Sequence, residues 1–226
     1  MSRTRRPRRG LLIALLLLAV VVLGGAVYVV YFSPLLVVRQ VSVSGNQQLR
    51  SDQVVAAAQV PMSTPLALQD VEAIARRAIT LPAVQAASVS RTWPDTITVT
   101  VTERRPLLAV RQPGGFALVD SEGVAFGESG SVPGGVMLVE VNPTDRPLLH
   151  DVGTVAAALP GGLGRQVSML AATDADRISL ELKSGVTVHW GSAADSPLKA
   201  EIVAALLKST KAASIDVSSP HNPAAR

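Results

Sequence analysis

The chain has 226 residues, 48% of them hydrophobic and none of them cysteine, with a formal net charge of +4 and an isoelectric point near 10.0. Five of its 21 Lys and Arg residues lie in the first nine positions, so the remainder carries 16 basic residues against 17 acidic ones. This distribution excludes a basic nucleic-acid-binding domain, and the lack of cysteine means that no disulfide can stabilise the fold.

The N-terminus predicts a membrane anchor. A basic cytoplasmic tail (residues 1–10) precedes a transmembrane helix (residues 11–32), and Gly10–Phe32 contains no charged residue. As a helix these 23 residues span about 34 Å, enough to cross a hydrocarbon core of about 30 Å. A cleaved signal peptide is the alternative, because Gly24-Gly25-Ala26 offers small residues, but the apolar run is longer than a signal core. We therefore expect a single-pass protein of the cytoplasmic membrane.

The orientation of this anchor follows from the basic tail. Positive charge beside a membrane-spanning helix is retained in the cytoplasm. The N-terminus is therefore expected to be cytoplasmic, with everything after residue 32 outside. The orienting residues are Arg3, Arg5, Arg6, Arg8 and Arg9.

Residues 35–104 predict a small α+β domain with the element order β-α-α-β-β. Alternating apolar residues, capping residues and prolines delimit its elements. The expected elements are a strand over 35–45, helices from Ser51 and Asp70, and strands over 84–91 and 96–103.

The last of these strands shows which face is buried. In "TITVTVTE" threonine alternates with Ile97, Val99 and Val101. Because successive strand side chains point to opposite faces, the aliphatic residues should contact the helices while the threonines face water. Helices therefore cover one side of this sheet only.

Residues 105–218 predict a mostly antiparallel β domain with a flanking C-terminal helix. Ser196-Pro197 begins that helix, whose expected buried residues are Leu198, Ile202, Ala205 and Leu206. A final strand follows over residues 214–218. The polar residues 219–226 are expected to form a flexible tail.

No motif predicts catalysis. The histidines (His150, His189 and His221) are scattered, and the chain lacks HExxH spacing and a G-x-S-x-G motif. We expect no catalytic residue, no metal and no cofactor. An enzyme anchored in the cell envelope remains an alternative without a visible site.

Several segments together resemble the FtsQ/DivIB family of bacterial cell-division proteins. They are "VRQVSVSGN", "TPLALQD", "LPAVQAASVSRTWPDTITVTVTERRPLLAV", "FALVDSEGVAF" and "LKAEIVAALLKSTKAASIDVSSP". The resemblance covers nearly the whole chain. It implies a POTRA domain over residues 35–104, an FtsQ-type β domain over 105–218, and a scaffold at the division septum rather than an enzyme.

The resemblance also implies partners and a binding site. Family members bind two bitopic coiled-coil division proteins, FtsB and FtsL, together with other divisome components, and FtsB adds a strand to the last strand of the β domain. An edge strand has unpaired backbone groups that a partner strand can satisfy. In some members of the family a basic residue on a neighbouring strand pairs with a partner carboxylate. The corresponding residues are Ser214, Ile215, Asp216, Val217 and Ser218, with Arg177 as the basic residue.

Three alternatives stay open. A POTRA-containing chain can instead be a chaperone-like module for protein transport or outer-membrane assembly. Trp93 can be a partner anchor or can pack against its own domain. Arg104-Arg105 can form a docking patch or a solvated hinge before Pro106.

Overall fold

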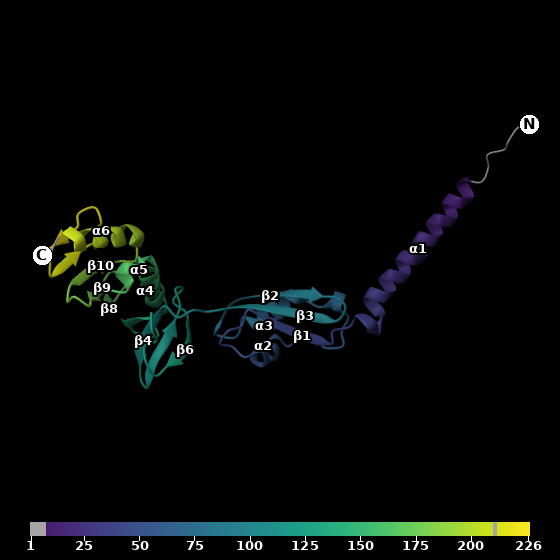
Figure 1. Ribbon diagram of the computed structural model, residues 1–226, viewed down its shortest axis with the longest axis horizontal. Coiled ribbons are helices and arrows are strands. Elements are labelled where there is room, and N and C mark those ends of the chain that lie inside the picture. The colour runs from purple at the N-terminus through teal and green to yellow at the C-terminus, as the bar shows by residue number, and fades with distance from the viewer. Residues whose placement is uncertain (1–7, 210–211) are drawn as a thin grey trace, which may run out of the picture. The chain divides into compact units, whose positions relative to one another are not determined.

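The computed structural model of the protein describes residues 8–209 and 212–226. The chain divides into two compact units, residues 1–103 and 104–226. The first holds the N-terminal helix and a small domain over residues 38–103, which we call the POTRA-type domain; the second is the C-terminal domain (Figure 1).

Helix α1 (Arg8–Phe32) contains the segment expected to cross the membrane. Within the described residues it is the one helix long and apolar enough to do so, and its apolar window is not buried inside the protein. Residues 1–7, including Arg3, Arg5 and Arg6, lie outside the described part of the chain. Arg8 and Arg9 form the first turn of α1.

The POTRA-type domain has the predicted order of elements. Its three-stranded sheet has the order β1-β3-β2, with β1 parallel and β2 antiparallel to the central strand. The elements are η1 (Pro34–Leu36), β1 (Gln40–Ser44), α2 (Ser51–Ala58), η2 (Leu66–Leu68), α3 (Val71–Ala78), β2 (Val84–Thr92) and β3 (Thr96–Glu103).

The core of this domain lies between β3 and the helices, as the alternation predicted. Ile97, Val99 and Val101 are buried against Val54 of α2 and Ile74 of α3. The threonines of β3 are half-buried or exposed on the other face. Helices thus cover one side of the sheet.

The first strand begins later than the sequence suggested. Residues 35–39 were expected to be part of it, but Pro34–Leu36 form a 3-10 turn, and β1 starts at Gln40. The Ser33 hydroxyl accepts a hydrogen bond from the Leu35 backbone N–H at 3.2 Å. This cap and the fixed φ of Pro34 favour a turn over an extended backbone.

The C-terminal domain is built on one nine-stranded sheet with the order β12-β11-β10-β9-β8-β7-β4-β5-β6. It is mixed: β10–β11, β4–β7 and β7–β8 pair in parallel and the other neighbours antiparallel. Its elements are β4 (Leu108–Gln112), β5 (Gly115–Val119), β6 (Ala125–Ser129), β7 (Met137–Glu140), α4 (Arg146–Ala158), α5 (Gly161–Gly164), β8 (Val167–Ala172), β9 (Ile178–Leu182), β10 (Thr187–Gly191), α6 (Ser196–Ser209), β11 (Ser214–Asp216) and β12 (Ala224–Ala225).

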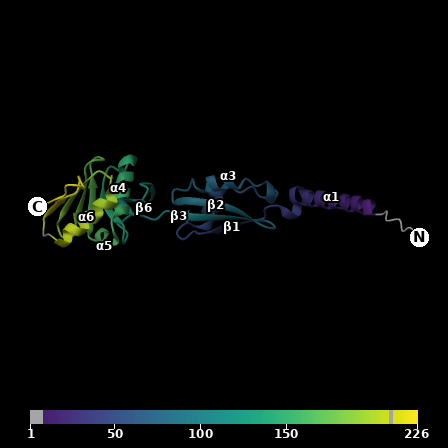
Figure 2. The same cartoon turned by 90° about the horizontal axis from the view of Figure 1, so that it is seen from above.

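Helices α4 and α6 contact each other and pack on the sheet (Figure 2). Val152 of α4 and Val203 of α6 are fully buried in the same cluster as Leu180, Val188 and Trp190 of the strands. The core of the domain therefore lies between these helices and one face of the sheet.

The buried face of α6 differs from the predicted one. Leu198 and Ala205 were expected to be buried but are exposed, whereas Lys199, Ala200 and Val203 are buried. The Lys199 ammonium donates to the backbone carbonyls of Trp190 at 3.1 Å and Ser192 at 2.9 Å. These bonds satisfy a buried cation and fix the rotation of α6, which turns Leu198 outward.

The end of the sheet also differs from the prediction. Residues 219–226 were expected to form a flexible tail, but Ala224–Ala225 form β12, antiparallel to β11. Ser214 and Arg226 exchange two backbone hydrogen bonds, of 2.9 and 2.8 Å. The tail thus folds back along β11.

Candidate partner-binding site

The predicted binding strand lies second from one end of the C-terminal sheet. β11 has β10 on one side and β12 on the other. The prediction of an open edge at residues 214–218 is therefore wrong for this structure, because the tail occupies it. The covering is short: only Ile215 and Asp216 lie in register with β12.

Alternation along the strand divides the five predicted contact residues into two groups. Ile215 and Val217 are fully buried and belong to the core cluster. Ser214, Asp216 and Ser218 are half-buried or exposed on the opposite face. A partner could therefore contact the side chains of these three residues, whereas Ile215 and Val217 hold the strand in place.

The accessible face of β11 continues across its neighbours. The sheet register places Ala171 (β8), Ser179 (β9), His189 (β10) and Asp216 (β11) side by side in one row. These residues are small or polar, and they lie on the face that the helices leave open. The row forms the floor of a shallow polar surface.

A pocket of about 370 Å³ lies on this face. It is lined by the row just described, by the loop residues Thr173, Asp176, Arg177 and Ser218, and by the strand residues Ala172, Ile178 and Gly191. The structure thus brings Arg177 together with Asp216 and Ser218, although about 40 residues separate them in the sequence. We call this pocket, together with β11, the sheet-end site.

Arg177 lies in the turn between β8 and β9. Its Nε is 2.7 Å from a carboxylate oxygen of Asp174, and the Arg177 side chain is 78% exposed. An exposed ion pair of this kind contributes little to stability. Its guanidinium is therefore able to exchange Asp174 for a carboxylate of another molecule.

Asp216 is a hydrogen-bonded carboxylate of the site. Its carboxylate accepts hydrogen bonds from the Ser218 hydroxyl at 2.7 Å and from the Ser218 backbone N–H at 2.9 Å. These bonds lower the pKa of Asp216, burial opposes the shift, and His189 and Arg226 lower it further. The Asp216 carboxylate is thus held in its charged form and fixes Ser218 just beyond the end of β11.

Gly191 allows the backbone of β10 to lie close to Ser218 at the rim of the pocket. Its φ is +76°, in the left-handed region, and a Cβ at this position would lie 2.9 Å from the Ser218 Cβ. Any other residue would be strained and would displace Ser218.

Sequence reasoning missed His189 and Ser179 as members of the site. The alternation of "VTVHWG" indicates that His189 faces away from the buried Trp190. The pairing of β9, β10 and β11, which brings these side chains next to Asp216, depends on long-range register and has no local signal.

The other candidate residues of the sequence analysis lie elsewhere. Trp93 is only half covered by its own domain, since 51% of the residue is exposed. Arg104 is no docking residue: its guanidinium pairs with Asp120 and, at 3.0 Å, with Glu122, and only 13% of its side chain is exposed. Among residues 8–209 and 212–226 the structure has no group of three or more His, Asp or Glu side chains placed to hold a metal.

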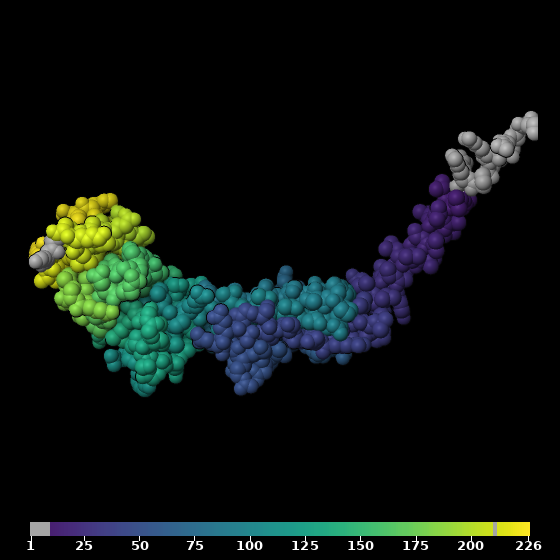
Figure 3. Space-filling model, in the orientation of Figure 1, coloured from purple at the N-terminus to yellow at the C-terminus, as the bar shows by residue number. Residues whose placement is uncertain are grey.

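Figure 3 shows the C-terminal part of the chain, in yellow, gathered at one end of the C-terminal domain. The binding geometry that results is a short strand end beside a polar pocket with one exposed arginine. Main-chain pairing with a partner strand at this end would require the tail to leave β11, and the pocket would then be available for the partner's side chains.

Two family models match the chain and follow its two folded parts. Residues 36–104 match the POTRA domain, FtsQ-type, and residues 109–218 match the C-terminal domain of the cell division protein FtsQ/DivIB. Together these matches cover most of the chain outside the N-terminal helix.

Whole-chain relatives agree with these models. The chain is 39% identical over 203 residues to the cell division protein FtsQ of Streptomyces griseus, covering 85% of this chain and 98% of that one. It is 37% identical over 239 residues to the FtsQ of Streptomyces coelicolor, covering 99% and 90%. Among solved structures, it is similar to the major extracytoplasmic domain of DivIB from Geobacillus stearothermophilus, at 17% identity and a TM-score of 0.36, covering 49% and 99%. The sequence relatives and both family models lead to one assignment: the chain belongs to the FtsQ/DivIB family of bacterial cell-division proteins.

Proposed function

We propose that the protein is a membrane-anchored scaffold of the division machinery that binds FtsB- and FtsL-like partners at the septum without catalysing a reaction. Helix α1 would hold it in the cytoplasmic membrane with the basic tail inside, linking cytoplasmic and extracytoplasmic division components. The observation that supports partner binding most directly is the sheet end, where β11 is covered by a strand of only two residues.

The short covering strand is weak enough to be displaced. Ser214 and Arg226 exchange two backbone hydrogen bonds, and each such bond contributes a net of about 0.5–1.5 kcal/mol. A partner strand that pairs along β11 and continues past Asp216 to Ser218 would form more bonds than the tail does. We therefore propose that an FtsB-like strand replaces β12 along β11.

The pocket beside β11 would give this pairing its specificity. A strand lying on β11 would carry its alternate side chains past Asp216 and towards Arg177. Arg177 presents an exposed guanidinium, which pairs well with a carboxylate, whereas Asp216 would repel one. A partner with one acidic residue placed opposite Arg177 is thus favoured over partners with other charge patterns.

The test is to lock the tail in place. In an antiparallel pair that exchanges both backbone bonds the Cα atoms are about 5.5 Å apart, which suits a disulfide. The variant carries Ser214→Cys and Arg226→Cys in the full chain, which has no other cysteine. After oxidation, the purified protein should no longer capture its FtsB-like partner in a pull-down, and reduction of the same sample should restore capture.

Removal of residues 219–226 is the complementary change. It leaves Ile215 and Val217 in the core but frees the edge, so capture should strengthen by about tenfold if the tail competes with the partner. Removal of residues 212–226 eliminates β11 and should abolish capture. Equal capture by the oxidised and reduced double-cysteine protein would refute strand replacement.

A further inference from the structure

Large apolar side chains are exposed at one end of the POTRA-type domain and in the segment that leads into it from α1. In soluble domains such residues normally occur singly, and a group of them marks a contact surface. The side chains are Leu35 (68% exposed), Met62 (50%), Leu68 (57%) and Trp93 (51%). We call these four residues the apolar end.

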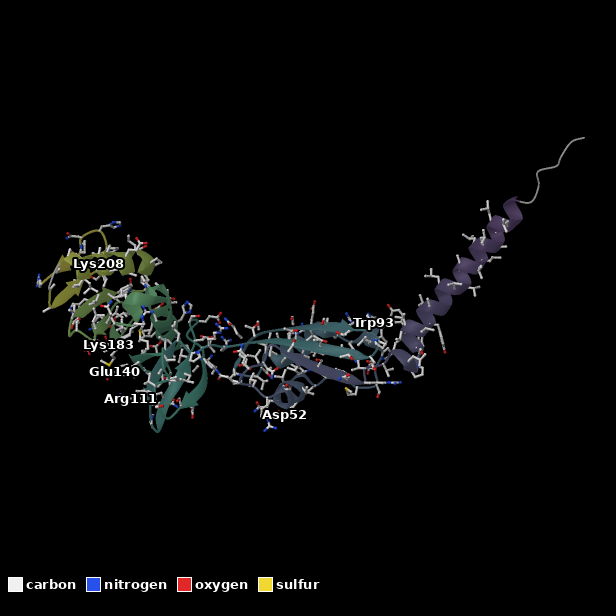
Figure 4. The ribbon with its side chains drawn as sticks, in the orientation of Figure 1. Asp52, Trp93, Arg111, Glu140, Lys183 and Lys208 are labelled. Atoms are coloured by element: carbon white, nitrogen blue, oxygen red, sulfur yellow. The ribbon has the colours of Figure 1, made fainter. Side chains whose placement is uncertain are left out.

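Backbone hydrogen bonds hold the three segments that carry these residues together. The Val38 N–H donates to the Thr64 carbonyl at 3.0 Å, which joins the segment of Leu35 to that of Met62 and Leu68. The Arg39 N–H donates to the Asp95 carbonyl at 2.9 Å, which joins it to the turn of Trp93. The four side chains therefore belong to one end of the domain, where the chain enters from α1. Figure 4 labels Trp93 at this end.

A short tether ties this end to the proposed membrane-spanning helix. α1 ends at Phe32, and Val38 is already buried in the core of the domain. Six residues extend at most about 20 Å, and the 3-10 turn Pro34–Leu36 shortens that reach. Whatever the angle between α1 and the domain, the apolar end stays close to the membrane surface.

The composition of the apolar end suits the interfacial layer of a bilayer. Tryptophan is enriched there because its ring is apolar while its indole N–H still finds polar partners. Arg39 is exposed beside it and forms no ion pair within the described part of the chain, although its guanidinium donates to the Pro34 carbonyl at 3.2 Å. An arginine in this position would attract lipid phosphates.

We propose that the apolar end docks on the outer surface of the membrane that α1 crosses, with Trp93 inserted among the lipid headgroups. This inference rests on the proposed membrane anchoring. It assigns the POTRA-type domain a second, peripheral membrane contact that limits its freedom above the bilayer.

The two tryptophans of the chain make a direct test possible. Trp93 is half exposed, whereas Trp190 is fully buried in the C-terminal domain. The full-length protein is reconstituted into phosphatidylcholine–phosphatidylglycerol vesicles whose acyl chains carry bromine close to the headgroup, a quencher that acts at short range. The wild-type protein should lose the Trp93 part of its fluorescence, and Trp93→Phe should lose none.

A second variant serves as a matched control. Ile79 is an exposed residue of the same domain, at the C-terminal end of α3 and away from the tether. In the Trp93→Phe background, Ile79→Trp should not be quenched by brominated lipid. Quenching of this residue as strong as that of Trp93, or quenching of Trp93 by aqueous acrylamide alone, would overturn the proposal.

Flotation of the vesicles separates this inference from the anchoring on which it rests. Protein that fails to float with the vesicles, or that alkaline carbonate extracts, would contradict membrane anchoring itself. Protein that floats while Trp93 remains insensitive to brominated lipid would contradict only the docking of the apolar end.

Discussion

At the scale of single residues, Asp120 and Arg104 form the least exposed ion pair in the described part of the C-terminal domain. Asp120 also accepts backbone hydrogen bonds from Glu122 and Val124, both at 2.9 Å. Asp120→Ala would leave the Arg104 charge with only the half-exposed Glu122, and we expect a loss of about 3 kcal/mol in unfolding free energy. Urea unfolding followed by the fluorescence of Trp190 measures this loss.

The matched control breaks an exposed pair of the same residue types. Asp174→Ala removes the partner of Arg177, whose side chain is 78% exposed, and should cost less than about 1 kcal/mol. Similar losses in the two variants would show that burial of the Arg104–Asp120 pair does not matter.

Residue-level predictions from the sequence succeeded where a side chain's environment follows from its own strand. The alternation of β3 placed Ile97, Val99 and Val101 correctly in the core. The helical periodicity of α6 predicted the wrong buried residues, since Lys199 is buried and Leu198 is exposed. A helical pattern alone favours leucine inside, and the carbonyls of Trp190 and Ser192 that hold the Lys199 ammonium become visible only in the folded chain.

At the scale of elements, Glu103 fixes the loop between β1 and α2. Its carboxylate accepts the backbone N–H groups of Gln47 at 2.7 Å, Gln48 at 2.9 Å and Leu49 at 2.8 Å. Burial raises the pKa of Glu103, but these three hydrogen bonds outweigh it and bring the pKa below the usual 4.5. The bonds require the charged form of the carboxyl group.

This arrangement predicts an acid-sensitive domain. For a carboxyl group whose folded pKa is lowered, the stabilisation is complete above pH 4.5 and is lost as the pH falls through the folded pKa. Glu103→Gln should therefore lower the stability of the POTRA-type domain at neutral pH and flatten its decline below pH 4.5. Thermal unfolding of the full chain at a series of pH values, followed by circular dichroism, measures both effects.

A carboxylate on the surface of the same domain provides the comparison. Glu72 is exposed, and its distance to Arg76 is 3.8 Å. Glu72→Gln should reproduce the wild-type dependence on pH. If Glu103→Gln and wild-type protein unfold in parallel throughout the acid range, the loop does not depend on the Glu103 charge.

Most elements of the fold could be predicted from the sequence, but the end of the C-terminal sheet could not. Strands such as β3 and helices such as α3 carry their own periodicity and caps. β12 consists of two alanines between Pro223 and Arg226, a segment with no alternation. It is a strand because β11 supplies the backbone partners, so its existence depends on a contact rather than on composition.

At the scale of the whole molecule, the five arginines of the N-terminal tail should determine orientation. Replacement of Arg3, Arg5, Arg6, Arg8 and Arg9 by glutamine should give a mixed topology, because the positive-inside bias is lost. A single cysteine at the exposed Glu201 reports the orientation, since the natural chain has none. A membrane-impermeant maleimide should label it in intact cells, and less so in the glutamine variant.

Replacement of the same arginines by lysine keeps the charge and should keep full labelling. If the glutamine variant is labelled as completely as the lysine variant, the tail does not orient the protein. The folded domains would then have to impose the topology by themselves.

Helix α6 connects β10 to β11, and this connection has a consequence for the exclusion of misfolded copies from the division complex. β11 pairs in parallel with β10, so the connection between these two strands must cross over the sheet, and α6 forms that crossover. Ile215 and Val217 belong to the same buried core as Trp190 and Val203, so the proposed partner surface at β11 exists only when that core is packed. If partners bind there as proposed, a copy with a defective core would not be recruited to the division complex, and recruitment itself would discriminate against misfolded molecules.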